Sequence, residues 1–142
     1  MKYIAFVKIR SGINADAKIK HVMNLLGLNK KNTLIVLEDT PSIRGNVHEV
    51  KDYITYGVIE EDFLEEVAEK RGTLFTKRLK DSKDKIVYTR FLTINKKKYN
   101  SHFALHPPRG GFERKGIKKA FVNGGALGDR KEKIKDLLVK ML

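Results

Sequence analysis

Short apolar runs mark three segments in the first sixty residues. Residues 2–9 (KYIAFVKI) and 33–37 (TLIVL) are rich in β-branched and aromatic side chains, which predicts strands. The second run is apolar throughout, as is typical of a central strand buried on both faces. Residues 52–59 (DYITYGVI) have the same propensity and predict a third strand.

Between these predicted strands, the apolar residues recur with the period of a helix. In the first interval, apolar residues recur at the spacing of one helical face: Ile19, Val22, Met23 and Leu26. Asn14 is the expected N-cap, Asp16 lies in the expected first turn, and Gly27 is the expected end of this helix.

A second, shorter helix is predicted from Val47, Val50 and Ile54, so helix and strand compete for residues 51–54. The resulting order, β-α-β-α-β with short connections, predicts an α/β (α+β) fold. We expect a small ferredoxin-like or split β-α-β core over residues 1–59, with the helices packed on the sheet.

Residues 60–142 are expected to pack with this core as one compact unit. Residues 60–72 predict an acidic amphipathic helix, and its apolar face comprises Phe63, Leu64, Val67 and Ala68. Residues 85–94 predict a strand, flanked by charged turns at 80–85 and 95–100. The last segment, 128–142, predicts a helix that closes a basic C-terminal extension.

The predicted apolar face of this last helix comprises Ile134, Leu137, Leu138 and Met141. Asp129 is the expected N-cap, and Glu132, three residues later, is expected to complete a capping box.

Charge is distributed unevenly along the chain. Residues 1–70 contain 10 Lys and Arg against 11 Asp and Glu, whereas residues 71–142 contain 20 against 6, a net charge of +14. A field of this kind attracts polyanions, and nucleic acid is the commonest intracellular polyanion. The alternative is a merely solvated charged surface, but such surfaces usually balance both signs. The imbalance favours nucleic acid.

The sequence contains few residue patterns that would indicate a catalytic or metal-binding site. The chain has no cysteine, which excludes disulfides and thiolate metal sites. The four histidines show no metal-ligand spacing, and NGGALGD (123–129) lacks the dinucleotide and phosphate-loop fingerprints. Lys8 and Arg10 interrupt the first apolar run far short of a signal-peptide or membrane-spanning length. We therefore expect a soluble cytoplasmic protein that is not an enzyme, with no cofactor, small-molecule substrate or membrane partner.

Two polar segments contain the strongest functional signal. EDTPSIRGNV (38–47) is expected to turn at Pro41 and to present Arg44, Gly45 and Asn46 where the second helix begins. HPPRGGFERKG (106–116) combines two prolines, a Gly-Gly pair and three cations. The prolines favour an extended backbone, the glycines allow close approach of a phosphate, and the cations can neutralise it. Phe112 can stack on an unpaired base or, alternatively, pack into the core.

Both segments resemble, nearly letter for letter, signature segments of the uL30 family of large-subunit ribosomal proteins. Residues 103–116 and 118–130, with the closing helix, are similar to the longer archaeal and eukaryotic members, whereas 73–101 matches poorly. The resemblance implies a structural protein bound to large-subunit rRNA, near the 5S rRNA and neighbouring ribosomal proteins. A free-standing RNA-binding module or an assembly factor is the alternative. The expected RNA-binding residues are Arg10, Arg44, Gly45, Asn46, His106, Arg109, Gly110, Gly111, Arg114, Lys115, Lys118 and Lys119.

Overall fold

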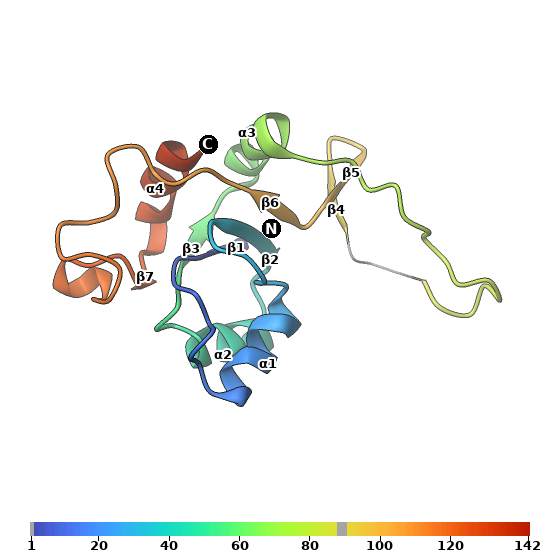
Figure 1. The fold of residues 1–142 in the computed structure, drawn as a ribbon. Coiled ribbons are helices and arrows are strands. Elements are labelled where there is room, and N and C mark those ends of the chain that lie inside the picture. Colours follow the sequence, from blue (N-terminus) through green and yellow to red (C-terminus); the bar gives the residue numbers. More distant parts are fainter. Residues whose placement is uncertain (1, 88–90) are drawn as a thin grey trace.

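A five-stranded sheet lies at the centre of the protein (Figure 1). The computed structural model describes residues 2–87 and 91–142. Strand β1 (Tyr3–Lys8) pairs antiparallel with both β2 (Thr33–Glu38) and β3 (Ile54–Ile59). β2 and β3 are therefore parallel to each other with β1 between them, which is a split β-α-β arrangement. The edges are β6 (His102–Ala104), antiparallel to β2, and β7 (Gly128–Asp129), parallel to β3.

Helices cover both faces of this sheet. Helices α1 (Ala17–Leu26) and α2 (Pro41–Glu49) pack on one face, and α3 (Glu61–Arg71) and α4 (Ile134–Met141) pack on the other (Figure 1). Successive side chains of a strand point to opposite faces, so β1 contributes to both hydrophobic clusters. The predicted α/β, ferredoxin-like core is confirmed.

The predicted apolar faces of three helices are confirmed. All four predicted residues are buried in α3 and all four in α4. In α1, Val22, Met23 and Leu26 are buried, and Ile19 packs against the same cluster. The burial of TLIVL on both faces is also confirmed, because Leu34 and Val36 join one cluster and Ile35 joins the other.

The ends of the first two helices differ from the prediction. The N-cap of α1 is Asp16, so the expected Asn14 cap is wrong, while Gly27 does end the helix with a φ of 79°. In α2, Pro41 is the first helical residue and the Thr40 hydroxyl accepts a hydrogen bond from the Ile43 N–H at 3.3 Å. The predicted turn at Pro41 is therefore wrong.

The competition between helix and strand after α2 is resolved in favour of the strand. The helix ends at Glu49, and Ile54 is the first residue of β3, so its assignment to the helix face is wrong. Ile54 pairs with β1 and is buried against α1 and α2, and these tertiary contacts favour the strand. Local propensity does not predict such contacts.

The C-terminal helix is shorter than the predicted 128–142. Gly128 and Asp129 pair with Thr55 and Tyr56 of β3, a 3-10 turn (Lys131–Lys133) follows, and α4 begins only at Ile134. The Asp129 side chain instead accepts the Lys131 N–H at 2.8 Å. The predicted capping box is wrong because pairing with β3 takes Asp129 out of the helix.

The segment between α3 and β6 forms a two-stranded arm of β4 (Phe91–Ile94) and β5 (Lys97–Asn100). The predicted strand 85–94 is confirmed for 91–94, whereas 85–87 form no strand, although Val87 makes an isolated bridge with Lys80; residues 88–90 lie outside the described residues. The predicted turn 95–100 is wrong beyond its first two residues, because 97–100 pair with β4.

Candidate nucleic-acid interface

The HPPRGGFERKG loop (residues 106–116) is attached to the end of α4. The His106 N–H donates to the Met141 carbonyl and the Arg109 N–H to the Lys140 carbonyl, both at 3.1 Å. The last carbonyls of a helix have no partner within the helix, so the loop satisfies groups that would otherwise need water. The loop and α4 thus stabilise each other.

Two successive turns shape this loop. The Gly111 N–H donates to the Pro108 carbonyl at 3.1 Å, and the Gly116 N–H donates to the Glu113 carbonyl at 2.9 Å. The extended backbone expected from the prolines is therefore wrong, because the chain turns twice and Pro108 is buried. Gly110 and Gly111 both have a φ of 80°, and a Cβ atom added at either would meet no atom within 4 Å. The backbone conformation requires glycine, and the surface around both residues is open.

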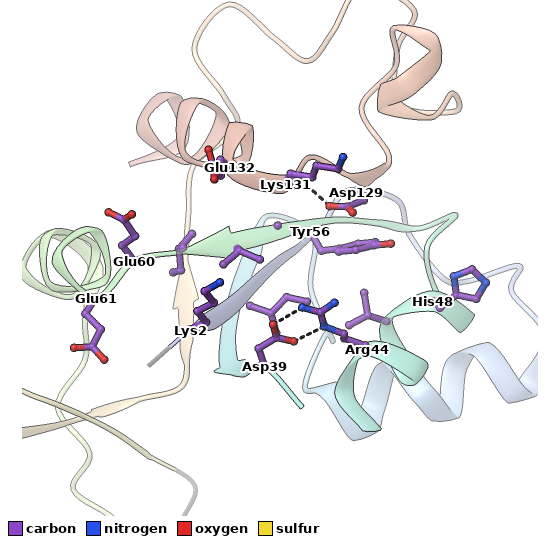
Figure 2. A pocket seen from close by; sticks show the side chains of 15 residues that line it. Lys2, Asp39, Arg44, His48, Tyr56, Glu60, Glu61, Asp129, Lys131 and Glu132 are labelled. Atoms are coloured by element: carbon purple, nitrogen blue, oxygen red, sulfur yellow. Dashed lines mark hydrogen bonds and ion pairs between the residues drawn. The ribbon is translucent and has the colours of Figure 1, made fainter. Parts of the chain in front are cut away.

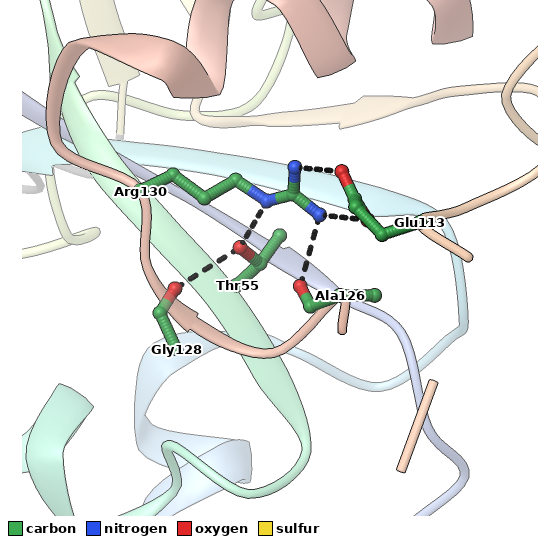
Figure 3. A network of polar contacts seen from close by, with 5 residues as sticks. All are labelled: Thr55, Glu113, Ala126, Gly128 and Arg130. Carbon is green, nitrogen blue, oxygen red and sulfur yellow. Dashed lines mark hydrogen bonds and ion pairs between the residues drawn. The ribbon is translucent and has the colours of Figure 1, made fainter. Parts of the chain in front are cut away.

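A buried polar network fixes the second half of the loop (Figure 3). The Arg130 side chain is only 3% exposed and forms an ion pair with Glu113. Its Nε donates to the Thr55 hydroxyl at 2.8 Å, and its Nη2 donates to the Ala126 carbonyl at 3.0 Å. The Thr55 hydroxyl donates in turn to the Gly128 carbonyl at 3.0 Å. One guanidinium therefore connects the loop with β3 and β7.

The ionisation of Glu113 depends on this network. Burial alone raises the pKa of the Glu113 carboxyl, but the hydrogen bonds and charge of Arg130 outweigh burial, and the pKa lies below its usual value. Both carboxylate oxygens accept from Arg130, Oε2 at 2.6 Å. Buried charges are tolerated when they are paired and hydrogen-bonded in this way.

Residues 112–127 fold into a small lobe beside the end of β1. The Lys115 N–H donates to the Gly124 carbonyl at 3.2 Å, and a 3-10 turn (Phe121–Asn123) returns the chain to the sheet. Ile9, Ala126 and Leu127 form the core of the lobe, and Phe112 and Ile117 pack against it. Phe112 is half-buried there, which favours the core-packing alternative over base stacking.

Five exposed cations lie on this loop and lobe, and we call them the basic loop surface: Arg109, Arg114, Lys115, Lys118 and Lys119. Within residues 2–87 and 91–142, none of them forms an ion pair. Cations without a protein partner keep their full attraction for phosphate. The side chain of His106 is exposed at the start of the same segment.

Arg44, Gly45 and Asn46 lie inside α2 rather than before it. Arg44 donates from Nε and Nη2 to the two carboxylate oxygens of Asp39, each at 2.5 Å, and these hydrogen bonds hold the pKa of Asp39 below its usual value. A guanidinium has five N–H donors, so Arg44 keeps donors for a phosphate.

A cleft of about 680 Å³ lies beside Arg44 (Figure 2). Its floor is apolar, but its charged lining has more carboxylates than cations: Asp39, Glu60, Glu61, Asp129 and Glu132 against Lys2, Arg44 and Lys131. Burial and the nearby Asp129 raise the pKa of the Tyr56 phenol in this cleft. This balance of charge does not suit a polyanion inside the cleft.

The structure does not bring all the expected residues together. Helix α2, with Arg44, packs on one face of the sheet, whereas the start of the loop, with Arg109, is bound to α4 on the other face. Arg10 lies between them at the end of β1. It is half-buried, donates from Nη1 to the Asp52 carbonyl at 3.3 Å, and its guanidinium lies over the Tyr53 ring.

Other kinds of site have no support in the part of the chain that the structure describes. No group of three or more His, Asp or Glu side chains there could hold a metal ion. No helix among those residues is both long and apolar enough to cross a membrane.

The Arg130 network was not predicted from the sequence. In the sequence, Arg130 is one more cation of the basic second half, and Glu113 is one residue of the loop. Thr55 and Arg130 are 75 residues apart, and pairing over such a distance has no local pattern. A single acid within a basic loop was the one signal that could have suggested a buried partner.

The split β-α-β sheet and the basic loop surface together define a small basic α+β protein with a surface suited to polyanions. Comparison with known families agrees with this class: residues 4–54 match the family described as "Ribosomal protein L30p/L7e". Three archaeal proteins, each named "Large ribosomal subunit protein uL30", are similar over nearly their whole length.

The protein from Methanococcus maripaludis is 36% identical, covering 97% of this chain and 98% of its own. The protein from Methanopyrus kandleri is 33% identical, covering 94% and 100%, and that from Nanoarchaeum equitans is 34% identical over all of both chains. The chain therefore belongs to the uL30 family of ribosomal proteins.

Proposed function

We propose that the protein is a structural component of the large ribosomal subunit and binds large-subunit rRNA without catalysing a reaction. Membership of the uL30 family carries this proposal, since the relatives are named as large-subunit proteins. The basic loop surface supports it independently, because five exposed cations there have no ion-pair partner within the described residues.

The loop suits phosphate binding because its shape is fixed before RNA arrives. Hydrogen bonds to α4 hold Arg109, and the Arg130 network holds Glu113 next to Arg114. A cation on a fixed backbone loses less conformational entropy on binding than one on a free chain. Arginine can bind a phosphate through two parallel hydrogen bonds, and lysine contributes a point charge.

Further contacts are proposed for the other expected residues. Arg10, Arg44, Gly45 and Asn46 would add contacts to the same RNA near α2, and His106, Gly110 and Gly111 would contact it beside the cations of the basic loop surface, which include Lys118 and Lys119. We also propose that this RNA lies near the 5S rRNA and that ribosomal proteins are neighbours in the cytoplasmic ribosome.

The salt dependence of rRNA binding tests this proposal. Each phosphate neutralised adds about 0.7–0.9 to the slope of log K against log salt. Replacing Arg109 and Arg114 together by Ala should reduce the slope by about 1.5 and weaken binding about tenfold or more at low salt. The control replaces Lys20 and Lys51, two exposed cations of the half without net positive charge. A wild-type slope near zero would contradict rRNA binding.

Co-sedimentation separates a ribosomal component from a free-standing RNA-binding module or assembly factor. We expect the protein to remain with mature large subunits after a high-salt wash. Recovery only with precursor particles, or only with free RNA, would favour the alternative.

A further inference from the structure

The arm between α3 and β6 has a firmly packed base. Ile94 is only 7% exposed and belongs to the same core cluster as α3 and α4, with Leu92 and Tyr99 packed against it. Backbone hydrogen bonds of 2.9 Å join Asn100 to Thr73 and Phe75 to Lys98. The direction in which the arm leaves the body is therefore fixed by the fold.

Beyond this base, residues 76–87 extend away from the body (Figure 1), and we call them the outer arm. Their internal structure consists of a bridge between Lys80 and Val87 and a short turn. In that turn the Asp84 N–H donates to the Asp81 carbonyl at 3.0 Å, and the Ser82 N–H donates to the Asp81 side chain at 2.7 Å. Leu79, Ile86 and Val87 are 39–62% exposed, so the outer arm buries little apolar surface of its own.

The outer arm has five cations, each exposed and without an ion pair among the described residues: Lys77, Arg78, Lys80, Lys83 and Lys85. Its only acids are Asp81 and Asp84. A segment with so much net charge and so little burial does not offset the entropy of ordering unless it binds a partner. A dense row of phosphates is the partner that offsets this entropy best, because the five cations together displace counterions from the nucleic acid.

The position of the outer arm relative to the basic loop surface is the second observation. The arm leads into β6, one edge strand of the sheet, whereas the lobe with the basic loop surface leads into β7, the opposite edge strand. Figure 1 shows the arm and the lobe on opposite sides of the sheet. A single RNA segment bound at the lobe would therefore not reach the arm.

We propose that the outer arm is a separate rRNA-binding element and that the protein braces two distinct segments of rRNA across its sheet. The rigid sheet sets the separation of the two segments, and binding at one edge raises the effective concentration of RNA at the other. The exposed Leu79, Ile86 and Val87 can contact sugar and base faces while the neighbouring cations bind phosphates. This inference rests on the proposed function, which it extends to a second surface.

Footprinting of reconstituted large subunits with hydroxyl radicals tests the proposal. In the arm variant, five cations are replaced by Gln: Lys77, Arg78, Lys80, Lys83 and Lys85. In the matched control, five exposed lysines of the first half are replaced by Gln: Lys18, Lys20, Lys30, Lys31 and Lys51. We expect wild type and control to protect two separate rRNA segments and the arm variant to lose one of them. The salt slope of the arm variant should fall by up to about 4. Thermal melting should show that both variants fold, because every substituted side chain is exposed.

The possible failures are distinguishable. If the arm variant keeps both protected segments and the wild-type salt slope, the arm inference is wrong and the proposed function stands. If wild type protects no rRNA at all, the proposed function fails, and this inference with it. Photocrosslinks from position 80 should form to rRNA. Crosslinks mainly to a ribosomal protein would show that the arm docks on protein and would overturn the inference.

Discussion

Replacing Glu113 by Gln probes the buried network that holds the signature loop. The change removes the negative charge beside Arg130 and leaves one amide oxygen where two carboxylate oxygens accept hydrogen bonds. Breaking a buried ion pair costs about 3–5 kcal/mol, because the remaining charge has no partner. Glu113 is 26% exposed on its side chain, so water can compensate in part. We expect a loss of about 2 kcal/mol in the free energy of unfolding at pH 7.

Urea and thermal unfolding measure this loss. For a chain of this length, about 2 kcal/mol corresponds to a fall in Tm of about 6 °C. The matched control is Glu66→Gln, the same substitution at the ion pair between Glu66 and Lys70 on the exposed side of α3. Exposed pairs contribute little to stability, so its Tm should remain within about 1 °C of wild type.

The pH dependence gives the decisive comparison. The pKa of Glu113 lies below its usual value in the folded protein, so its ionised form stabilises the fold. That stabilisation is complete above the usual Glu pKa of about 4.3 and is lost as the pH falls through the lower, folded-state value. The difference between wild type and Glu113→Gln should therefore close in acid. An equal difference at pH 7 and pH 3, or none at pH 7, would refute this account of the network.

Three further substitutions test local packing, each by thermal melting. Gly45→Ala should stabilise the protein by about 0.5–1 kcal/mol, because Gly45 lies at an exposed position inside α2 and a methyl group there meets no atom within 4 Å; a loss of stability would contradict this. Gly57→Ala should destabilise it by at least about 2 kcal/mol, because the new Cβ would lie 2.2 Å from the Lys131 carbonyl oxygen; a neutral result would mean that α4 can move away. Phe112→Ala should destabilise it by about 1–2 kcal/mol through lost packing, whereas unchanged melting with weaker rRNA binding would restore the stacking role.

The sequence predicted those parts of the fold that depend on repeated local patterns. The faces of α1, α3 and α4 were correct because four residues at helical spacing are a redundant signal. Single-residue signals were less successful. Asn14 and Asp16 have equal capping propensity, and only the backbone at Asp16 decides between them. The start of α2 was predictable in principle, since Thr followed by Pro is a common helix beginning.

Long-range pairing accounts for what the sequence did not predict. Gly128 and Asp129 have poor strand propensity, yet they pair with β3 because an open edge is available there. At the candidate interface, the composition of the 106–116 loop predicted exposed cations correctly, but the shape of the loop depends on hydrogen bonds to α4 and on the contact of Glu113 with Arg130. Neither partner is close to the loop in sequence.

The contribution of α4 to the core also bears on the order in which the protein can fold during its synthesis. Ile134, Leu137, Leu138 and Met141 are all buried against strands and a helix that are translated long before them. The face covered by α1 and α2 needs nothing beyond residue 56 and can form early. The other face stays incomplete until residues 134–141 have left the exit tunnel, and the loop at 106–116 lacks its carbonyl partners until then. The basic loop surface is thus completed last, which would delay its attachment to RNA until the chain is nearly finished.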